Sequence, residues 1–589
     1  MSKYPCVKTQ KEEPCPAGDP TGEKNRPLDE ADFPRDRSRR SFLAKAGAAA
    51  TVAVAARALN LESTANAQST GGSGSSAEIG PLSDSARAQA CFNLRQSVAQ
   101  ADFNQPLVSH LSNGDDSLYP DKCGSFTKCL PHDSFGRVDL NAYQSLITAL
   151  STGNPSDFAN ITMGGTNLLT NPQSGLAFDL EGMDAHNLTV PPAPALTSAG
   201  MAAEMVELYW ASLLRDVPFD QYPSNPIAQQ AALELSLMPA YQGPRINGQV
   251  GPQFLFRGGL GSTFAGETVG PYISQFALIP TELGVQPISQ QWRVFLSGQD
   301  FLTSFSDWLT VQSGGSTGLS PQMDPQVRYP RNGRDWASFT HVDVLSQAYF
   351  VALLVLMNLN APPNPGLPYN NSRTQVGFGT FGGGDFAGTL NEVATSALKA
   401  VWFQKWFVHR RLRPEAAGGL VHLMKTGQGN QVSCKFNKNL LNSIAVQYSF
   451  NKYGSYLLSQ SFSEGCPTHP SYPTGHGTVA GACVTVLKFF FNGNWTIPNP
   501  VMPSDDGLSL QPYSGSPLTV NAELSKLCHN VSFGHGIHAG IHYRSDSDQS
   551  ILLGEAVALG VLQDRARTYN EKFSVSLTKF DGTTATISN

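Results

Sequence analysis

The chain has little charge and no excess of basic residues. Only 15% of its 589 residues are charged, with 40 Lys and Arg against 46 Asp and Glu, so the formal net charge is −6. Proteins that bind duplex nucleic acid usually carry a clear basic excess, so the composition argues against such a partner. A hydrophobic fraction of 40% also argues against a disordered chain, which needs low hydrophobicity and high net charge.

Several patterns of known chemistry are also missing. The sequence has no CxxC pair, which argues against a zinc ribbon or a thioredoxin-like site. It has no P-loop lysine motif and no serine nucleophile elbow. Residues 377–382 (GFGTFG) match GxGxxG, but no apolar strand precedes them, so we interpret them as a flexible loop.

The N-terminal segment has the order of an export signal. Arg39 and Arg40 precede a Phe-Leu pair and an Ala/Val run, and Ala65–Ala67 then offers a cleavage site before Gln68. This order resembles a bacterial twin-arginine signal. The apolar run is far shorter than the ~20 residues that a membrane span needs. We therefore expect residues 1–67 to be removed and the protein to be periplasmic or extracellular, with no membrane span. Their removal takes away 11 Lys/Arg and 9 Asp/Glu, which leaves 29 basic and 37 acidic side chains and a net charge of −8.

Seven cysteines remain in the mature chain, and an odd number leaves at least one of them unpaired. Cys123 and Cys129 lie in one Gly/Pro/Asp-rich stretch, so they are the best local candidates for a disulfide in an oxidising compartment.

Helical periodicity dominates the rest of the sequence. Apolar residues recur at helical spacing in five stretches, at 197–215, 343–359, 389–412, 476–491 and 549–563. Strand-like alternation is scarce, apart from a hairpin expected around Asp581-Gly582. Gly and Pro number 55 and 40, which predicts long loops. We expect a mainly α protein in which a helical region at 68–388 packs as one unit with a region at 389–589.

Eight of the twelve histidines lie between residues 405 and 542, in a window with three notable elements. The first is the helix at 389–412, for which Thr389 and Glu392 predict a capping box at the start. Near its end lie Lys405 and Arg413, the latter at the point where Pro414 breaks the helix. Two cations so placed can point at a single anion, although a solvated basic patch is the common alternative for such a run.

The second element is HPSYPTGHG at residues 469–477. Pro470 and Pro473 keep the chain extended up to Thr474, after which a helix rich in small residues is expected. The backbone N–H groups of Gly475 and His476 then lie at a helix N-terminus, where anions bind favourably. Thr474 adds a hydroxyl, and His476 can transfer protons near neutral pH.

The third element is a histidine followed by an acid. His542 and Asp546 are four residues apart, a spacing at which a carboxylate can fix the tautomer of an imidazole and free its other nitrogen to bind an electrophilic centre. Such a pair is weak evidence alone, but it gains weight from the two elements before it.

Together these elements resemble the vanadium-dependent haloperoxidases, which share their site with the acid phosphatases of the type 2 phosphatidic-acid phosphatase superfamily. The superfamily pattern is Lys-x6-Arg-Pro, then Pro-Ser-Gly-His, then Arg-x5-His-x3-Asp, and the resemblance is dense over residues 389–560. The seven residues between Lys405 and Arg413, the HPSYP string and the C-terminal tail favour the red-algal and cyanobacterial bromoperoxidase branch. The resemblance implies paired helical bundles and a homo-oligomer.

The resemblance also implies a vanadate cofactor and a role for each matching residue. His542 coordinates vanadium and Asp546 orients its ring. Lys405, Arg413, Thr474 and the Gly475 amide hold the vanadate oxygens, while His476 is the acid–base group and Lys405 polarises bound peroxide. Charge-assisted hydrogen bonds suit such an oxyanion. Trp402 and His469 border the expected halide position, although core packing accounts for Trp402 equally well.

Two departures from the pattern stand out. Thr474 replaces the usual serine but keeps the hydroxyl. The arginine of the third element is absent, because counting six back from His542 gives Gly536, whereas alignment from Lys526 places His535 there with one extra residue before His542. Our hypothesis is that His535, with His538 as a second candidate, replaces the arginine as a titratable donor, so that vanadate affinity falls as pH rises above ~7.

The predicted activity is the oxidation of halide by hydrogen peroxide to hypohalous acid, which halogenates small organic molecules. Bromide or iodide is the expected halide, with chloride as a further possibility. The alternatives are an acid phosphatase in which His542 is the nucleophile and His476 protonates the leaving group, and an inactive homologue that only binds an oxyanion.

Overall fold

A computed structural model describes residues 80–259 and 266–589, so the twin arginines and the expected cleavage site lie outside the described residues. From Asp84 to Asn589 the chain forms one compact unit.

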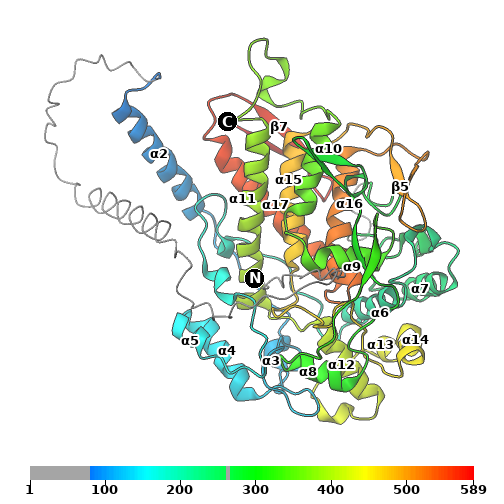
Figure 1. Cartoon of the computed structure of the whole chain (residues 1–589). Coiled ribbons are helices and arrows are strands. Elements are labelled where there is room, and N and C mark those ends of the chain that lie inside the picture. The colour runs from blue at the N-terminus through cyan, green and yellow to red at the C-terminus, as the bar shows by residue number, and fades with distance from the viewer. Residues whose placement is uncertain (1–79, 260–265) are drawn as a thin grey trace, which may run out of the picture. The chain divides into compact units, whose positions relative to one another are not determined.

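Four long helices form the centre of this unit (Figure 1). They are α11 (Gly383–Phe403), α15 (Gly475–Phe490), α16 (Val520–Phe533) and α17 (Arg544–Ala566), and α15 packs against the other three. Glycines allow α15 and α17 to approach closely, because a Cβ on Gly481 would lie 2.0 Å from the Ile551 carbonyl oxygen and one on Gly554 would lie 1.9 Å from that of Thr478. Every residue of α15 except His476 is buried, which explains the run of small and apolar residues in its sequence.

Shorter helices surround this centre. They are α3 (Asp115–Leu118), α4 (Leu140–Thr152), α5 (Pro155–Ala159), α6 (Ala199–Leu213), α7 (Pro226–Ser236), α8 (Phe305–Gln312), α9 (Gly333–Val342), α10 (Gln347–Asn358), α12 (Pro414–Lys425), α13 (Lys438–Leu441) and α14 (Ile444–Tyr453). Among the described residues, no single helix has both the length and the apolarity to cross a bilayer, although the bent pair α9 and α10 meets the test on length and composition alone.

The strands form four two-stranded antiparallel sheets in the described part of the chain. They pair β1 (Thr281–Leu283) with β2 (Gln286–Ile288), β3 (Trp292–Phe295) with β4 (Met323–Arg328), β5 (Val501–Pro503) with β6 (Leu510–Pro512), and β7 (Ser574–Thr578) with β8 (Thr584–Ser588). The mainly α class is confirmed. The predicted C-terminal hairpin is also present, with Gly582 at φ +81°, a left-handed conformation that glycine tolerates.

The predicted start of α11 is wrong. The helix begins at Gly383, six residues before Thr389, because the Asp385 side chain accepts a hydrogen bond from the Phe381 amide (2.9 Å). The expected capping-box residues have other partners: the Thr389 hydroxyl bonds Asp385 (3.3 Å), and Glu392 pairs with Arg565 (2.5 Å).

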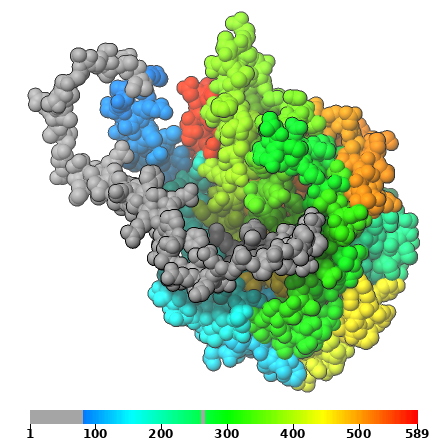
Figure 2. Space-filling view, viewed as in Figure 1, coloured from blue at the N-terminus to red at the C-terminus, as the bar shows by residue number. Residues whose placement is uncertain are grey.

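The helix α2 (Asp84–Phe103) buries none of its residues. In Figures 1 and 2 it extends away from the helical centre as the blue segment. Phe92 and Phe103 on this helix are 61% and 82% exposed.

A buried ionic network lies on α16 and α17. His529 contacts the carboxylates of Glu267 (3.2 Å) and Asp548 (3.0 Å). Burial alone would lower the pKa of His529, but these two carboxylates raise it to about 9. The histidine is therefore positively charged at neutral pH.

Candidate active site

Lys405 lies on a π-helical turn, η7 (Gln404–His409), that continues α11. Its Nζ is fully buried and donates to the carbonyls of Pro470 and Ser471, both at 2.9 Å. A π turn takes up one extra residue relative to an α-helix. It therefore explains how seven residues, instead of the superfamily's six, separate Lys405 from Arg413 while both reach one site.

Arg413 immediately precedes α12 and is also buried. Its Nη1 donates to the Ile541 carbonyl and to Nε2 of His542, both at 2.9 Å, and its Nη2 contacts the His469 ring at 2.9 Å. Within residues 80–259 and 266–589, neither Arg413 nor Lys405 pairs with an acidic side chain. Buried charges are normally paired, so these two cations form a site for an anion.

The helix N-terminus predicted at Gly475 is confirmed, with Thr474 as the N-cap. The Thr474 hydroxyl is buried and has no hydrogen-bond partner among the described residues. It does not cap the helix, so it is free to bond an oxygen of a ligand. The amides of the first turn lie beside it, which adds donors and the positive end of the helix dipole.

The contact predicted between His542 and Asp546 is present, with Nδ1 and Oδ2 3.0 Å apart. Asp546 also accepts bonds from Ser471 Oγ (2.5 Å) and Arg411 Nη1 (2.6 Å), so its oxygens act as acceptors. The Nδ1 of His542 therefore carries the proton. Its Nε2 keeps a lone pair, which now accepts a hydrogen bond from Arg413.

His476 and His535 stack at 3.7 Å between ring centroids, and His476 Nε2 lies 3.0 Å from Asp343 Oδ1. The His535 ring lies 5.7 Å from that of His542, and its Nδ1 has no partner within the described chain. The structure thus places His535 beside His476 and His542. A second π turn, η9 (Gly534–His538), absorbs the one extra residue before His542.

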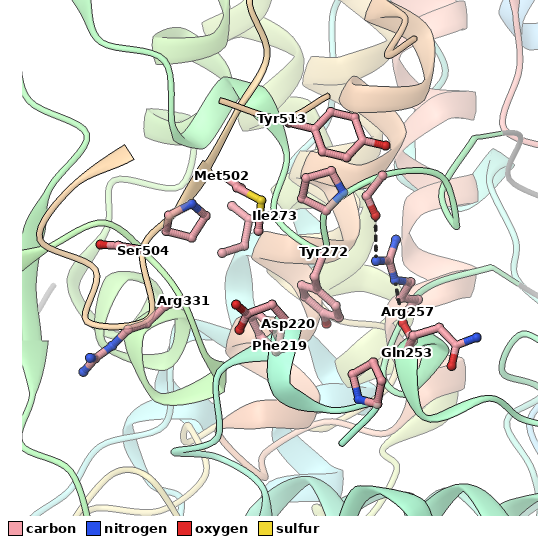
Figure 3. Close-up of a pocket in the computed structure, with 14 residues that line it drawn as sticks. Phe219, Asp220, Gln253, Arg257, Tyr272, Ile273, Arg331, Met502, Ser504 and Tyr513 are labelled. Carbon is pink, nitrogen blue, oxygen red and sulfur yellow. Dashed lines mark hydrogen bonds between the residues drawn. The ribbon is translucent and has the colours of Figure 1, made fainter. Parts of the chain in front are cut away.

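His538 does not reach the site. Its Nε2 bonds the Tyr272 hydroxyl (2.9 Å), and its ring packs against Phe219 and Phe256. Tyr272 also lines a cavity of about 390 Å³ with Phe219 and Arg257 (Figure 3), and none of the predicted site residues lines that cavity. The suggestion that His538 assists His535 is therefore wrong, because the π turn directs His538 to the opposite side.

Burial changes the protonation of the whole cluster. It lowers the pKa of Lys405 well below its usual value, and the nearby Arg413 charge adds to this effect. Burial likewise lowers the pKa values of His542 and His535 well below the ordinary range, with positive neighbours contributing. Both imidazoles are therefore neutral near pH 7, so the lone pair of His542 is available and His535 is not a fixed cation.

The remaining predicted residues lie at the edge of the cluster. The Trp402 ring is 4.8 Å from the His469 ring and 6.0 Å from Lys405 Nζ, and Trp402 Nε1 donates to the Thr170 carbonyl (3.0 Å). Trp402 and His469 are at most 9% exposed. Trp402 thus has a packing role and also lies beside the cation.

Sequence reasoning missed four residues that support the site, namely Glu204, Asp343, Arg411 and Ser471. Arg411 pairs with both Asp546 (2.6 Å) and Glu204 (2.8 Å), which fixes the carboxylate that orients His542. Only Arg411, in the 389–412 element, and Ser471, in HPSYPTGHG, lie inside the three sequence elements. An arginine or a serine alone does not reveal a role in the site. Their partners are more than 70 residues away in the chain.

The cluster is suited to a small oxyanion. Two buried cations, an unused hydroxyl and a helix N-terminus supply donors, while an imidazole lone pair supplies one ligand for an electrophilic central atom. These features agree in type with the donors expected from the sequence.

Comparison with known proteins gives a consistent result. No protein-family model matches the chain. The vanadium-dependent bromoperoxidase of Corallina officinalis is 35% identical over 594 residues, covering 85% of this chain and 98% of the relative. That of Ascophyllum nodosum is 35% identical over 499 residues, covering 81% and 87%. Among solved structures, the homohexameric second vanadate-dependent bromoperoxidase of Ascophyllum nodosum superposes with a TM-score of 0.82 at 28% identity, covering 89% of this chain and 94% of that one.

Proposed function

The chain belongs to the vanadium-dependent bromoperoxidase family, and from this membership we propose that it is a haloperoxidase that uses vanadate and hydrogen peroxide to oxidise bromide or iodide. The observation that carries the proposal is the pair of buried cations, Lys405 and Arg413, which have no acidic partner and which flank the lone pair of His542. Hypohalous acid, or its equivalent, then halogenates small organic substrates.

The residues present fit vanadate. In the proposed complex, Nε2 of His542 is the vanadium ligand, because Asp546 holds the proton on Nδ1. Arg413 and Lys405 bond the oxygens as charge-assisted donors, and the Thr474 hydroxyl and the Gly475 amide complete the set. To hold the ligand, Arg413 would give up its bond to His542 Nε2, while its bonds to the His469 and Ile541 carbonyls could remain.

Bound vanadate supplies a Lewis-acid centre that activates peroxide toward halide without changing its oxidation state. The protein residues move the protons. His476 Nε2 contacts Asp343, which leaves Nδ1 as the nitrogen that accepts the proton of incoming hydrogen peroxide. Lys405 would donate to an oxygen of the bound group, and burial of the cluster would strengthen the effect of its charge there.

We place the halide beside Trp402 and His469. Their rings lie against each other next to Lys405, and their burial excludes water from that side. A halide there would approach the activated oxygen next to a cation, which lowers the cost of removing its hydration shell.

A parallel assay tests the proposed activity. Purified protein freed of vanadate receives orthovanadate, peroxide and bromide with a dye that becomes brominated, and a second sample receives p-nitrophenyl phosphate without vanadate. We expect bromination that depends on added vanadate. Cleavage of the phosphate ester alone would instead support a phosphatase with His542 as nucleophile, and vanadate binding without turnover would support an inactive homologue.

We also propose that the protein is a homo-oligomer. The solved relative is homohexameric, and within residues 80–259 and 266–589 the aromatic side chains Phe92 and Phe103 of α2 are exposed. Light scattering of the full chain is expected to give several times the monomer mass, and removal of residues 84–103 is expected to weaken the assembly. A full chain that is monomeric at micromolar concentration would contradict this proposal.

Export by the twin-arginine route is a further proposal, supported by the order of Arg39-Arg40, the apolar run and the Ala65–Ala67 site. N-terminal sequencing of the secreted protein is expected to begin at Gln68. A variant with both arginines changed to lysine is expected to stay in the cytoplasm, and unchanged secretion of that variant would refute this route.

A further inference from the structure

The cysteine expected to pair with Cys129 has a different neighbour. The Cys123 thiol lies 3.7 Å from the hydroxyl of Ser433, the residue directly before Cys434, and the Cys434 thiol is near enough to raise the pKa of Cys123. Cys123 is partly buried against the main core and Cys434 is a member of it. Cys129 is fully buried, and its backbone packs against Gly314. The local pairing of Cys123 with Cys129 is therefore not the contact that the fold makes.

Asp121 holds the two cysteine-bearing segments together. Its carboxylate accepts hydrogen bonds from the Cys123 amide (3.3 Å), the Ser433 amide (2.7 Å) and the Ser433 hydroxyl (2.5 Å). Cys123 Sγ also lies 3.7 Å from Ser433 Oγ. The backbones on both sides of the thiol pair are thus fixed by one charged residue, so the two sulfurs stay adjacent without help from the thiols themselves.

We propose that Cys123 and Cys434 form a disulfide when the chain folds in an oxidising environment. The fold brings the two thiols close together, and a disulfide requires such proximity of two cysteines whose backbones are already close. This site joins the loop before α4 to the segment between α12 and α13.

The oxidant is a protein or small-molecule disulfide, which is reduced to two thiols as the Cys123–Cys434 bond forms. The thiolate of one cysteine attacks that disulfide and forms a mixed disulfide, and one thiol of the oxidant leaves. The thiolate of the second cysteine then attacks the sulfur of the first, which forms the Cys123–Cys434 bond and releases the second thiol of the oxidant. Two electrons and two protons pass to the oxidant. The neighbouring Cys434 thiol and burial raise the pKa of Cys123 in the folded chain, so the oxidant reacts with it more slowly than with an exposed cysteine.

The bond would brace the active-site scaffold. The segment just after Cys123 pairs with the strand-like residues before α12: Ser125 bridges to Arg411, and the Phe126 amide donates to the Arg410 carbonyl (2.8 Å). Because Arg411 and Arg413 come from that segment, a link at Cys123 stabilises the backbone that carries them.

The test is a disulfide map of the wild-type chain, which needs no variant. Full-length protein produced by secretion, or refolded with oxidised glutathione, is denatured without reductant, alkylated and digested for mass spectrometry. We expect a linked peptide pair that contains Cys123 and Cys434, with Cys129, Cys466, Cys483 and Cys528 alkylated. Alkylation of both Cys123 and Cys434, or linkage of either to another cysteine, would overturn the proposal.

A second measurement compares melting temperatures. A bridge across so long a loop is expected to raise Tm by about 4 °C, and reductant is expected to remove that gain. Cys434→Ser is expected to melt where the reduced wild type melts and to show no response to reductant. Cys91→Ser, which changes an exposed cysteine on α2, is the matched control and should keep the full response. An equal response in Cys434→Ser and in the wild type would also refute the bond.

Discussion

The orientation of His542 by Asp546 provides a sharp test of the site. The Asp546 carboxylate accepts from His542 Nδ1 (3.0 Å), Ser471 Oγ (2.5 Å), Arg411 Nη1 (2.6 Å) and the Tyr543 amide (3.1 Å). In Asp546→Asn one oxygen becomes an NH2 group, although Arg411 on Oδ1 and the Tyr543 amide on Oδ2 can both only donate, so either orientation loses one of these bonds. We expect the oxygen to stay with the charged Arg411, so that the new NH2 group faces His542, donates to Nδ1 and moves the imidazole proton to Nε2.

The change removes the lone pair that faces the anion site. Loss of an orienting partner of a metal-bound histidine costs about 10–100-fold in affinity, which corresponds to about 1.4–2.7 kcal/mol. We expect the vanadate Kd to rise by this factor. Loss of one of the two buried ion pairs of Arg411 is also expected to lower the free energy of unfolding by about 3 kcal/mol.

Equilibrium dialysis of the vanadate-free protein measures the Kd directly, and denaturant unfolding measures stability. The matched control is Asp548→Asn, which alters an equally buried carboxylate on the same helix that pairs with His529 instead of His542. The control should lose stability but keep its vanadate affinity. A vanadate Kd for Asp546→Asn within twofold of the wild type would refute the proposed role of the tautomer.

Four further predictions follow from the same contacts. Because burial lowers the pKa of Lys405, vanadate affinity measured by dialysis should be highest below that pKa and fall as pH rises through it. Lys405→Met should bind vanadate about 10–100-fold more weakly, and its affinity should not show this fall with pH. His535→Phe keeps the ring that stacks on His476 but removes a donor, so its Kd should rise about tenfold, and because burial keeps His535 neutral near pH 7, the fall in affinity expected from this residue above pH ~7 should be absent from the wild type; an unchanged Kd would show that His535 does not contact the ligand. In Trp402→Ala, a changed ratio of bromide to iodide turnover is expected, whereas an unchanged ratio with a lower Tm would assign Trp402 to packing. His529 has a folded-state pKa of about 9, above the ~6.5 of an unfolded histidine. Its contribution of about 3 kcal/mol to the free energy of unfolding is therefore fully present below pH 6.5 and is lost as pH rises through 9. Denaturant unfolding of His529→Gln should not show this loss of stability.

The sequence predicted the parts of the site that depend on local spacing. The helix start at Gly475 followed from the prolines before it, and the contact of His542 with Asp546 followed from their separation of four residues. The predicted start of α11 is wrong because the helix already begins at Gly383, where Asp385 in its first turn accepts a hydrogen bond from the Phe381 amide. A local pattern cannot rank two competing helix starts.

The missed features depend on the folded chain. The two π turns explain why the counts before Arg413 and His542 differ from the superfamily pattern, but a count of residues cannot locate them. Arg411 reaches Glu204 and Asp546 across more than 130 residues of sequence. Arg411 and Arg413, two positions apart, look alike in the string, and only the fold shows that Arg411 is paired with carboxylates whereas Arg413 has no acidic partner among the described residues.

The most direct test of the central claim is an experimental structure of the protein with orthovanadate. We expect density for one vanadate per chain, bonded to Nε2 of His542 and surrounded by Lys405, Arg413 and Thr474, with Nδ1 of His542 still on Asp546. Vanadate bound elsewhere, or density at the cluster with no bond to His542, would contradict the account.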